Sequence, residues 1–317
     1  MGRRILIIKL GAFGDLLLAD GAIRDICAHH AGDAITILTG PAYRKLYARH
    51  PLVQQVLVDP RAPRWRLDRL YRLNRTVAFD TFDIIYDLQK SARTGFYFRL
   101  FVRRAAWSGR VRGCALPFTL PERPLTLQEE YAIQLEAAGV PVRYTGSPDL
   151  AWMVDDVAAV LAAAGVGDRY VVLLPGASAR HAHKCWPHYA ELGCQLLAAG
   201  YPVVTVPGPA DLALCRTMPG TMLTGTGPYL DYFQLAGVLR GAAFVVGNDS
   251  GPTHLAALLG TPGVALFGAG GKQYQRNMQR GRFACLYSER IGDITAAEVG
   301  ARVAAELRGA AVEVSAV

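Results

Sequence analysis

Short apolar runs rich in β-branched residues alternate along the chain with stretches of helical periodicity. In the first half, the apolar runs predict buried strands at 4–8, 34–38, 53–58 and 82–88. Apolar positions at helical spacing predict helices at 16–29, 43–49, 67–75, 94–104 and 127–138. In the second half, we predict strands at 170–174, 202–206, 243–246 and 264–267, helices at 155–164, 188–199, 210–218, 230–239, 249–260 and 295–307, and a loose tail at 312–317.

The two alternating sets are separated by residues 141–155, where the pattern lapses into Pro, Gly and Ser. Strands that alternate with helices are typical of doubly wound sheets. The sequence therefore predicts an α/β protein with two Rossmann-like, doubly wound domains, residues 1–150 and 151–317, that face a cleft.

The turn Gly247–Gly251 joins a predicted strand to a predicted helix, at the sheet edge where α/β proteins bind ligands. Five polar residues crowd it: Asn248, Asp249, Ser250, Thr253 and His254. Backbone N–H groups at the helix start, with the hydroxyls of Ser250 and Thr253, suit an anionic phosphate. Capping of the helix by Asp249 and Ser250 is the plainer alternative, but it does not explain the other three residues.

A second glycine-containing turn, Gly11–Asp15, follows the first predicted strand. Its glycines let the backbone approach a ligand closely. The turn lacks a full dinucleotide-binding fingerprint, and Thr39-Gly40 stands where an acidic ribose ligand would follow the second strand. Asp15 either caps the next helix or aims a carboxylate into the cleft, where it could take a proton from a hydroxyl.

The long predicted turn 175–187 carries Arg180 and Lys184, whose charges suit a diphosphate; a solvated basic loop is the alternative. Four potential metal ligands in or next to this turn match no standard zinc spacing, so we predict no metal site there: His181, His183, Cys185 and His188. Residues 268–272 resemble the end of a phosphate-binding P-loop, but Gln273 replaces the required Ser or Thr.

The composition of the chain limits the class of protein and the compartment that we expect for it. A chain of 317 residues, 51% of them hydrophobic and 19% charged, is globular and long enough for two domains. The six cysteines form no CxxC pair, which indicates a reducing, cytoplasmic setting. The first residues imitate a signal peptide, but Lys9 and Asp15 interrupt the apolar run, and we expect no membrane span.

Charge is concentrated in residues 61–112, which hold 13 basic and 4 acidic residues and so carry +9, against +8 for the whole chain. Such a surface predicts an anionic partner, whether nucleic acid, a lipid headgroup surface or an acidic sugar. Nucleic acid is not favoured, because few aromatic residues accompany the arginines and no known motif occurs. The arginines of 61–75 either form a solvated face or bind an acidic acceptor.

Three motifs together resemble the heptosyltransferases of glycosyltransferase family 9. They are Lys-Leu-Gly-Ala-Phe-Gly-Asp at 9–15, Pro-Gly-Ala-Ser with Lys-x-Trp-Pro in 175–187, and Gly-Asn-Asp-Ser-Gly-Pro-Thr-His-Leu-Ala-Ala at 247–257. The resemblance covers almost the whole chain in the right order. It implies a GT-B architecture, with an N-terminal domain for the acceptor and a C-terminal domain for the nucleotide sugar.

The resemblance also implies residue roles. Asp15 matches the family's proposed general base, Lys184 its donor-phosphate lysine, and 249–251 the turn that holds the donor. The predicted donor-binding residues are Ser178, Arg180, Asp211, Asn248, Asp249, Ser250, Gly251, Thr253 and His254. The predicted acceptor-binding residues are Gly11, Phe13, Arg61, Arg64, Arg66, Lys90 and Arg93. The chain departs from the family at 268–273, where Gly-Ala-Gly-Gly-Lys-Gln replaces the usual Gly-Pro-Thr, and this leaves the donor sugar open.

The expectation is a metal-independent, inverting glycosyltransferase that needs no cofactor. It would move a heptose-like sugar from ADP-heptose to an anionic, lipid-linked core acceptor, in the cytoplasm or at the inner face of the inner membrane. Two rivals stay open: a related transferase with another nucleotide sugar or a protein or capsule acceptor, and a non-enzymatic module that binds anionic saccharide.

Overall fold

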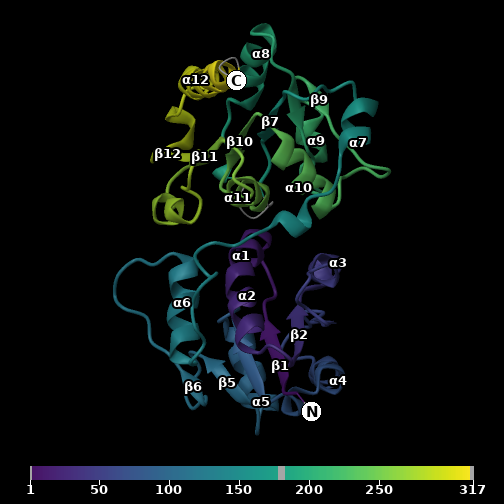
Figure 1. Cartoon of the computed structure of the whole chain (residues 1–317), viewed down its shortest axis with the longest axis vertical. Helices are drawn as coiled ribbons and strands as arrows, with labels where there is room; N and C mark the ends of the chain where they lie inside the picture. The colour runs from purple at the N-terminus through teal and green to yellow at the C-terminus, as the bar shows by residue number, and fades with distance from the viewer. Residues whose placement is uncertain (1, 178–182, 315–317) are drawn as a thin grey trace. The chain divides into compact units, whose positions relative to one another are not determined.

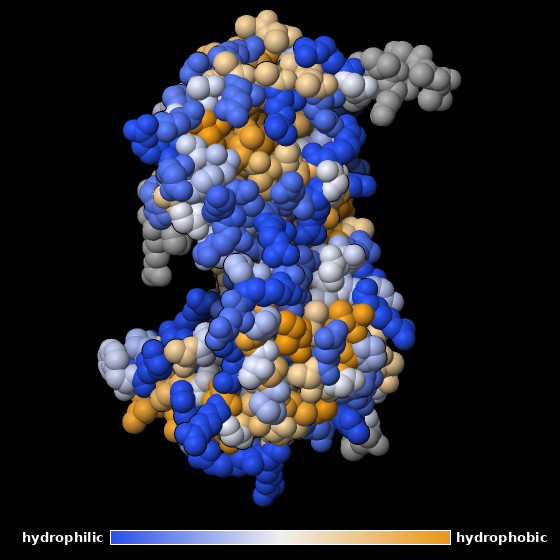
Figure 2. All heavy atoms as spheres, turned by 90° about the vertical axis from the view of Figure 1, so that its left-hand side faces the viewer, coloured by the Kyte–Doolittle hydropathy of each residue, from blue (hydrophilic) through white to orange (hydrophobic). Residues whose placement is uncertain are grey.

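The computed structural model describes residues 2–177 and 183–314, which divide into two compact units, Met1–Trp152 and Met153–Val317. Each unit is described by itself (Figure 1). On the face of the molecule shown in Figure 2, hydrophilic side chains cover much of both units, and apolar side chains gather in smaller patches.

The N-terminal unit is built on one six-stranded sheet in the order β3-β2-β1-β4-β5-β6, with every pair parallel. Its strands are β1 Arg4–Ile8, β2 Ala34–Thr39, β3 Gln55–Val58, β4 Ile84–Asp87, β5 Ala106–Gly109 and β6 Leu116–Pro117. Its helices are α1 Phe13–Leu18, α2 Asp20–His29, α3 Arg44–Ala48, α4 Leu67–Val77, α5 Ala92–Phe101 and α6 Leu127–Ala137. This is the strand order of a doubly wound fold.

The β1 strand shows why the sheet is covered on both faces. Its four residues Ile5–Ile8 are fully buried, although successive side chains of a strand point to opposite faces. Leu6 and Ile8 share one core cluster with Leu70 and Leu73 of α4 and Tyr97 of α5. The opposite face is covered by α1, α2 and α6, which contact one another.

The C-terminal unit repeats this plan in the order β12-β11-β10-β7-β8-β9, again with parallel pairs. Its strands are β7 Val171–Leu174, β8 Val203–Thr205, β9 Thr221–Met222, β10 Phe244–Asn248, β11 Gly263–Phe267 and β12 Phe283–Tyr287. Its helices are α7 Ala158–Ala163, α8 Tyr189–Ala198, α9 Leu212–Cys215, α10 Tyr232–Gly241, α11 Gly251–Leu258 and α12 Ala296–Val314. The sheet packs on α8 and α12 through one apolar cluster, which includes Leu173, Leu192, Val246 and Val303.

The two doubly wound units confirm the predicted fold class, with corrections in detail. The predicted helix at 16–29 is two helices, α1 and α2, that meet at Ala19. The sequence prediction missed β5, β6, β9 and β12. The expected tail is wrong for 312–314, because α12 continues to Val314; 315–317 lie outside the described residues.

Candidate active site

In the N-terminal unit, the strand order reverses between β1 and β4, and candidate residues gather where these two strands end. Open parallel sheets bind ligands at such a switch point, beyond the carboxyl ends of the strands. Lys9 follows β1, while Asp87 ends β4 and Lys90 follows it. The backbone N–H of Leu10 donates to Gln89 Oε1 at 2.8 Å, so the two turns are bonded to each other.

Asp15 lies in the first turn of α1 and does not cap it. The N-cap position belongs to Ala12, and no side chain caps this helix end. The capping alternative for Asp15 is therefore wrong. Its side chain is 49% exposed, and its Oδ2 lies 3.9 Å from Lys9 Nζ. The Asp15 carboxylate is thus accessible to a ligand, and the buried ammonium of Lys9 lies close to it.

Lys9 is a site residue that the sequence prediction did not include. Only 2% of it is exposed, and burial lowers the pKa of its ammonium to about 8, although the nearby charge of Asp15 opposes that shift. The ammonium also lies 5.6 Å from the centre of the Tyr131 ring, within reach of a cation–π contact. A lysine placed directly after a buried strand was the signal that could have revealed it.

Lys90, a predicted acceptor residue, already has a partner. Its ammonium bonds Glu130 Oε2 at 2.6 Å and lies 4.5 Å from the centre of the Tyr131 ring. Asp87 accepts the backbone N–H groups of Gln89 and Lys90, and this holds Lys90 at a φ of +49°. Burial raises the pKa of Asp87 to about 6. An anionic ligand at this position would have to compete with Glu130 for the lysine.

Gly11 and Phe13 pack against Tyr43. Gly11 has a φ of +136°, and a Cβ at this position would lie 3.0 Å from the Tyr43 ring, so both conformation and space require glycine. The Phe13 ring stacks on Tyr43 with 6.5 Å between centroids. The Arg61 guanidinium donates to the Leu10 carbonyl at 2.7 Å. These contacts fix the backbone of the turn that leads to Asp15.

Arg93 is also bound within the unit. It donates to the Ala62 carbonyl and to the Tyr97 hydroxyl, and Tyr97 donates to the buried carboxylate of Asp59 at 2.7 Å. Arg61 joins the same network, because its backbone N–H donates to Asp59 Oδ1 at 2.7 Å. Arg61 and Arg93 therefore shape the loop after β3, a supporting role that their charge alone did not reveal.

Arg64 and Arg66 complete the predicted acceptor residues. Arg64 is exposed, whereas Arg66 is half-buried and pairs with Asp68, with 3.0 Å between Nε and Oδ1. Hydrogen bonding to Arg66 lowers the pKa of Asp68 to about 2. Both residues lie just before α4. Arg66 is paired with a carboxylate, whereas no carboxylate of the described residues forms an ion pair with Arg64.

In the C-terminal unit, the strand order reverses between β7 and β10, and Asn248 connects the ends of these strands. Its amide nitrogen donates to the carbonyls of Pro175 and Gly176. Its oxygen accepts from the Trp186 backbone and the Tyr189 hydroxyl at 3.0 and 3.1 Å. Asn248 is fully buried, and these hydrogen bonds support the surrounding loops; its contact with the donor stays a prediction.

Lys184 and Asp249 form the charged pair at this edge. The two side chains approach to 2.5 Å and are 28% and 11% exposed. His254 Nε2 lies 3.8 Å from the other oxygen of Asp249. The pair brings Lys184 to the start of α11, as the sequence predicted, and a diphosphate bound there would compete with Asp249 for the ammonium.

Ser250 occupies the N-cap position of α11, and its side chain makes no capping hydrogen bond. Instead it lies 3.0 Å from the hydroxyl of Thr253, which is fully buried. The expected capping by Asp249 and Ser250 side chains is therefore wrong. Gly251 begins the helix, and Thr253 contacts Ser250 from within the fold.

Asp211, the predicted ribose ligand, lies close to the end of β7. A Cβ on Gly176 would lie 2.1 Å from the Asp211 carboxyl carbon, so only glycine admits this approach. Burial raises the pKa of Asp211. Ser178, Arg180 and His181 lie outside the described residues.

In residues 2–177 and 183–314, no group of three His, Cys, Asp or Glu side chains has a metal-binding arrangement. His188, one of the four potential metal ligands considered from the sequence, bonds the Gly292 carbonyl at 2.9 Å. Within the same ranges, no helix is long and apolar enough to cross a membrane.

Comparison with known proteins places the chain in a family. It is 38% identical to lipopolysaccharide heptosyltransferase 3 of Escherichia coli over 117 residues, which span only 33% of this chain and 33% of that protein. It is 25% identical to lipooligosaccharide heptosyltransferase 2 of Haemophilus ducreyi over 86% of this chain and 85% of that protein. The solved E. coli ADP-heptose lps heptosyltransferase II shares the fold, with a TM-score of 0.75, 22% identity and coverage of 96% and 99%. Residues 70–291 match the profile of glycosyltransferase family 9 (heptosyltransferase), and the chain belongs to this family.

Proposed function

We propose that this protein transfers a heptose-like sugar from ADP-heptose to an anionic, lipid-linked acceptor of the lipopolysaccharide core. The proposal is supported by family membership and by relatives named as lipopolysaccharide or lipooligosaccharide heptosyltransferases. ADP-heptose is the nucleotide sugar in the name of a structural neighbour. The reaction would proceed with inversion, without a metal ion, in the cytoplasm or at the inner face of the inner membrane.

Asp15 is the proposed general base. It takes the proton of the acceptor hydroxyl, and the oxygen attacks the anomeric carbon from the face opposite the diphosphate. The bond from that carbon to the diphosphate breaks, and ADP leaves with the electron pair. Half-exposure of Asp15 supports this role, because a base must reach its substrate. Lys9 acts as a positioning residue, because its buried ammonium attracts the carboxylate of Asp15.

The leaving diphosphate is assigned to the start of α11. The helix begins at Gly251 without a side-chain cap, so its first backbone N–H groups are directed at an incoming anion. Lys184 supplies the positive charge that stabilises the departing phosphate oxygens. We infer that the diphosphate takes over the lysine from Asp249 when it binds, because both anions require the same ammonium.

The single observation that carries the proposal is the placement of Asp15 and of Lys184 at the switch points of the two sheets of a family 9 chain. Donor profiling by melting temperature tests it. ADP-heptose should raise the Tm of the wild type, because a ligand that binds only the folded state stabilises that state. Equal shifts with every nucleotide sugar would contradict the proposed donor.

A specific observation supports one alternative class of donor. Residues 268–273 depart from the usual family sequence, and Lys272–Asn277 form a short 3-10 helix that overlaps this departure. A transferase with another nucleotide sugar, or with a protein or capsule acceptor, would give its largest Tm shift with that other sugar.

A further inference from the structure

Three large apolar side chains in one short segment are strongly exposed to solvent. Trp65 is 76% exposed, Leu67 66% and Tyr71 63%, and in the described part of the chain no other large hydrophobic residue exceeds half exposure. Exposed apolar residues scattered singly are normal, but a group of this kind marks an interaction surface. We call these three residues the α4 apolar flank, because they lie on α4 or directly before it.

The helix α4 separates this flank from the core. Leu70, Leu73 and Val77 form its buried stripe and pack against the sheet. Leu67 and Tyr71 are four residues apart, so they lie next to each other on the helix surface, outside the buried stripe. The flank is therefore attached to a helix that the fold already holds, and its exposure is not a result of local disorder.

Positive charge surrounds the flank. Residues 61–75 hold six arginines and one acidic residue, Asp68, a net charge of +5. Asp68 pairs with Arg66 and Arg72, at 3.0 and 3.2 Å, and within residues 2–177 and 183–314 no carboxylate forms an ion pair with the other arginines of α4, Arg69 and Arg75. Apolar and aromatic residues beside a high density of arginine are typical of helices that lie in an anionic lipid interface.

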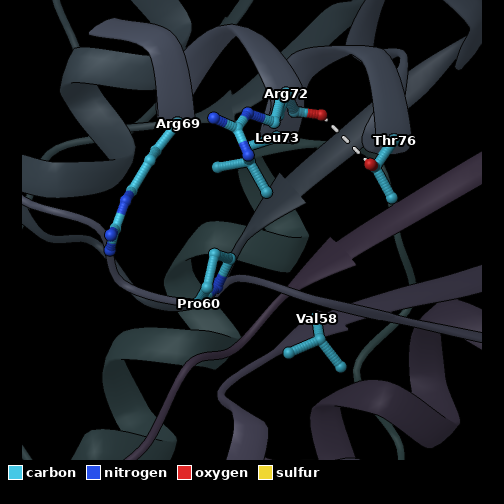
Figure 3. A pocket seen from close by; sticks show the side chains of 6 residues that line it. All are labelled: Val58, Pro60, Arg69, Arg72, Leu73 and Thr76. Carbon is cyan, nitrogen blue, oxygen red and sulfur yellow. Dashed lines mark hydrogen bonds between the residues drawn. The ribbon is translucent and has the colours of Figure 1, made fainter. Parts of the chain in front are cut away.

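A pocket of about 420 Å³ lies on another side of α4, between the helix and the end of β3 (Figure 3). It is lined by Val58, Pro60, Arg69, Arg72, Leu73 and Thr76. The backbone carbonyl of Arg72 is occupied by the Thr76 hydroxyl at 3.0 Å, while the Arg69 side chain extends toward the loop at Pro60. The guanidinium groups of Arg69 and Arg72 at this rim give a lipid phosphate a place to bind on the same helix as the apolar flank.

We infer that the α4 apolar flank and Arg69, Arg72 and Arg75 form a docking surface for an anionic phospholipid bilayer. Trp65, Leu67 and Tyr71 enter the headgroup region, where amphipathic aromatic rings are favoured, and the arginines bind lipid phosphates. The inference rests on the proposed function for its purpose, since a lipid-linked acceptor is reached from the membrane surface. Its physical basis, exposure and charge, is independent of that function.

Vesicle binding tests this surface. The full chain should co-sediment with phosphatidylcholine vesicles that contain about one-third phosphatidylglycerol, and much less with pure phosphatidylcholine. Replacing Trp65, Leu67 and Tyr71 by Ser should weaken binding by at least about tenfold. Replacing Arg69, Arg72 and Arg75 by Gln should weaken it about a hundredfold at low salt, about fivefold for each arginine.

Matched controls come from the same unit. Leu100 and Tyr144 are exposed by 40% and 37%, so L100S/Y144S removes apolar surface elsewhere. The variant R104Q/R112Q/R143Q removes three exposed arginines from other segments. Both controls should bind vesicles as the wild type does. Trp65 also serves as a reporter: its fluorescence should shift to the blue with anionic vesicles, and W65F should lose that shift.

The outcomes separate this inference from the proposed function. Transfer to a water-soluble, delipidated acceptor should be equal in the wild type and the W65S/L67S/Y71S variant. If that transfer occurs and the wild type does not bind anionic vesicles, the inferred docking surface is wrong and the proposed function is supported. If vesicles are bound through α4 and no donor is used, the function is wrong and the surface stands. A dimer that depends on Trp65, Leu67 and Tyr71, without vesicle binding, would overturn the membrane inference in favour of self-association.

Discussion

The ammonium of Lys9 lies 3.9 Å from the carboxylate of Asp15, with the lysine buried and the aspartate half-exposed. The sequence places them six residues apart, at the end of a strand and in the first turn of the next helix. Burying an ammonium is unfavourable, and its lowered pKa of about 8 reflects that cost. Groups with shifted pKa values cluster at functional sites, so this pair is consistent with the proposed role of Asp15 in proton transfer.

Replacement of Asp15 by Asn should abolish turnover and leave the affinity for the donor nearly unchanged. A general base typically contributes about a hundred- to ten-thousandfold to the rate, so kcat should fall by that range. Steady-state kinetics and donor titration measure the two effects. Glu122→Gln, which removes an exposed carboxylate from the same unit, is the control and should behave as the wild type. Near-normal turnover of a folded Asp15→Asn protein would remove Asp15 from the mechanism.

Lys9→Met should make the protein more stable at pH 7 and less active. The pKa of Lys9 is lowered from 10.5 to about 8 on folding, so below pH 8 the folded state bears the full cost of the buried charge. Between about pH 8 and 10.5 the unfolded state binds more protons, and wild-type stability rises with pH relative to the variant. The gain at pH 7 should be about 1–3 kcal/mol.

The same variant should lower kcat about tenfold, equivalent to about 1.4 kcal/mol, because Asp15 loses its buried partner. A purely structural role would not predict a more stable protein with slower turnover. The kcat advantage of the wild type over Lys9→Met should also shrink as Lys9 loses its proton above about pH 8. Chemical denaturation and a pH–rate profile measure these effects; equal kcat values across the profile would rule out the positioning role.

Lys184→Ala should weaken donor binding and slow transfer, and Lys184→Arg should restore part of both. Loss of one charge-assisted hydrogen bond to a phosphate costs about 1.5–3 kcal/mol. Asp249→Asn is the informative partner variant, because the Asp249 carboxylate lies 2.5 Å from the Lys184 ammonium. If the diphosphate takes over the lysine, Asp249→Asn should bind ADP at least as tightly as the wild type. A weaker ADP affinity would mean that Asp249 itself contacts the donor.

The arginines before α4 should govern acceptor affinity. Arg64→Gln should raise the acceptor KM and reduce its salt dependence, because an exposed charge is screened by salt. Arg61→Gln should lower kcat as well, since Arg61 holds the Leu10 carbonyl in the turn before Asp15. Kinetics at several salt concentrations distinguish the two; an unchanged KM in Arg64→Gln would leave this arginine as solvated surface.

Addition of EDTA should leave the rate unchanged, because the proposed stabilisation of the diphosphate uses Lys184 and the start of α11. Activity assays before and after chelation measure this. Activity that is lost with EDTA and restored by Mg²⁺ or Mn²⁺ would contradict the metal-independent proposal.

The fold could be predicted because its signals are local. The long buried strands are mainly apolar runs, most of them with several β-branched residues, and each strand-to-helix turn carries Gly, Pro or a polar residue. The missed strands had weaker signals: β6 and β9 are two residues long, and β5 contains Ser108 and Gly109. By contrast, β12 is an apolar run, Phe283–Tyr287, that periodicity could have revealed.

The positions of Asp15, Lys184 and 249–251 beside the strand ends were predictable, because motif and turn coincide there; their roles stay predictions. The partners of these residues were not predictable, because they depend on distances between segments far apart in sequence. Lys90 is bonded to Glu130, which is 40 residues away in the sequence, and Asn248 accepts a hydrogen bond from Trp186, which is 62 residues away. Charge alone therefore does not show which basic groups already have a carboxylate partner, and polarity alone does not show that Asn248 is buried.

The most direct test is product analysis with ADP-heptose and a delipidated core acceptor. The wild type should release ADP and give an acceptor that carries one added heptose, with anomeric configuration by NMR opposite to that of the donor. Asp15→Asn should give neither product under the same conditions. Retention of configuration, or undiminished transfer by Asp15→Asn, would contradict the proposed mechanism.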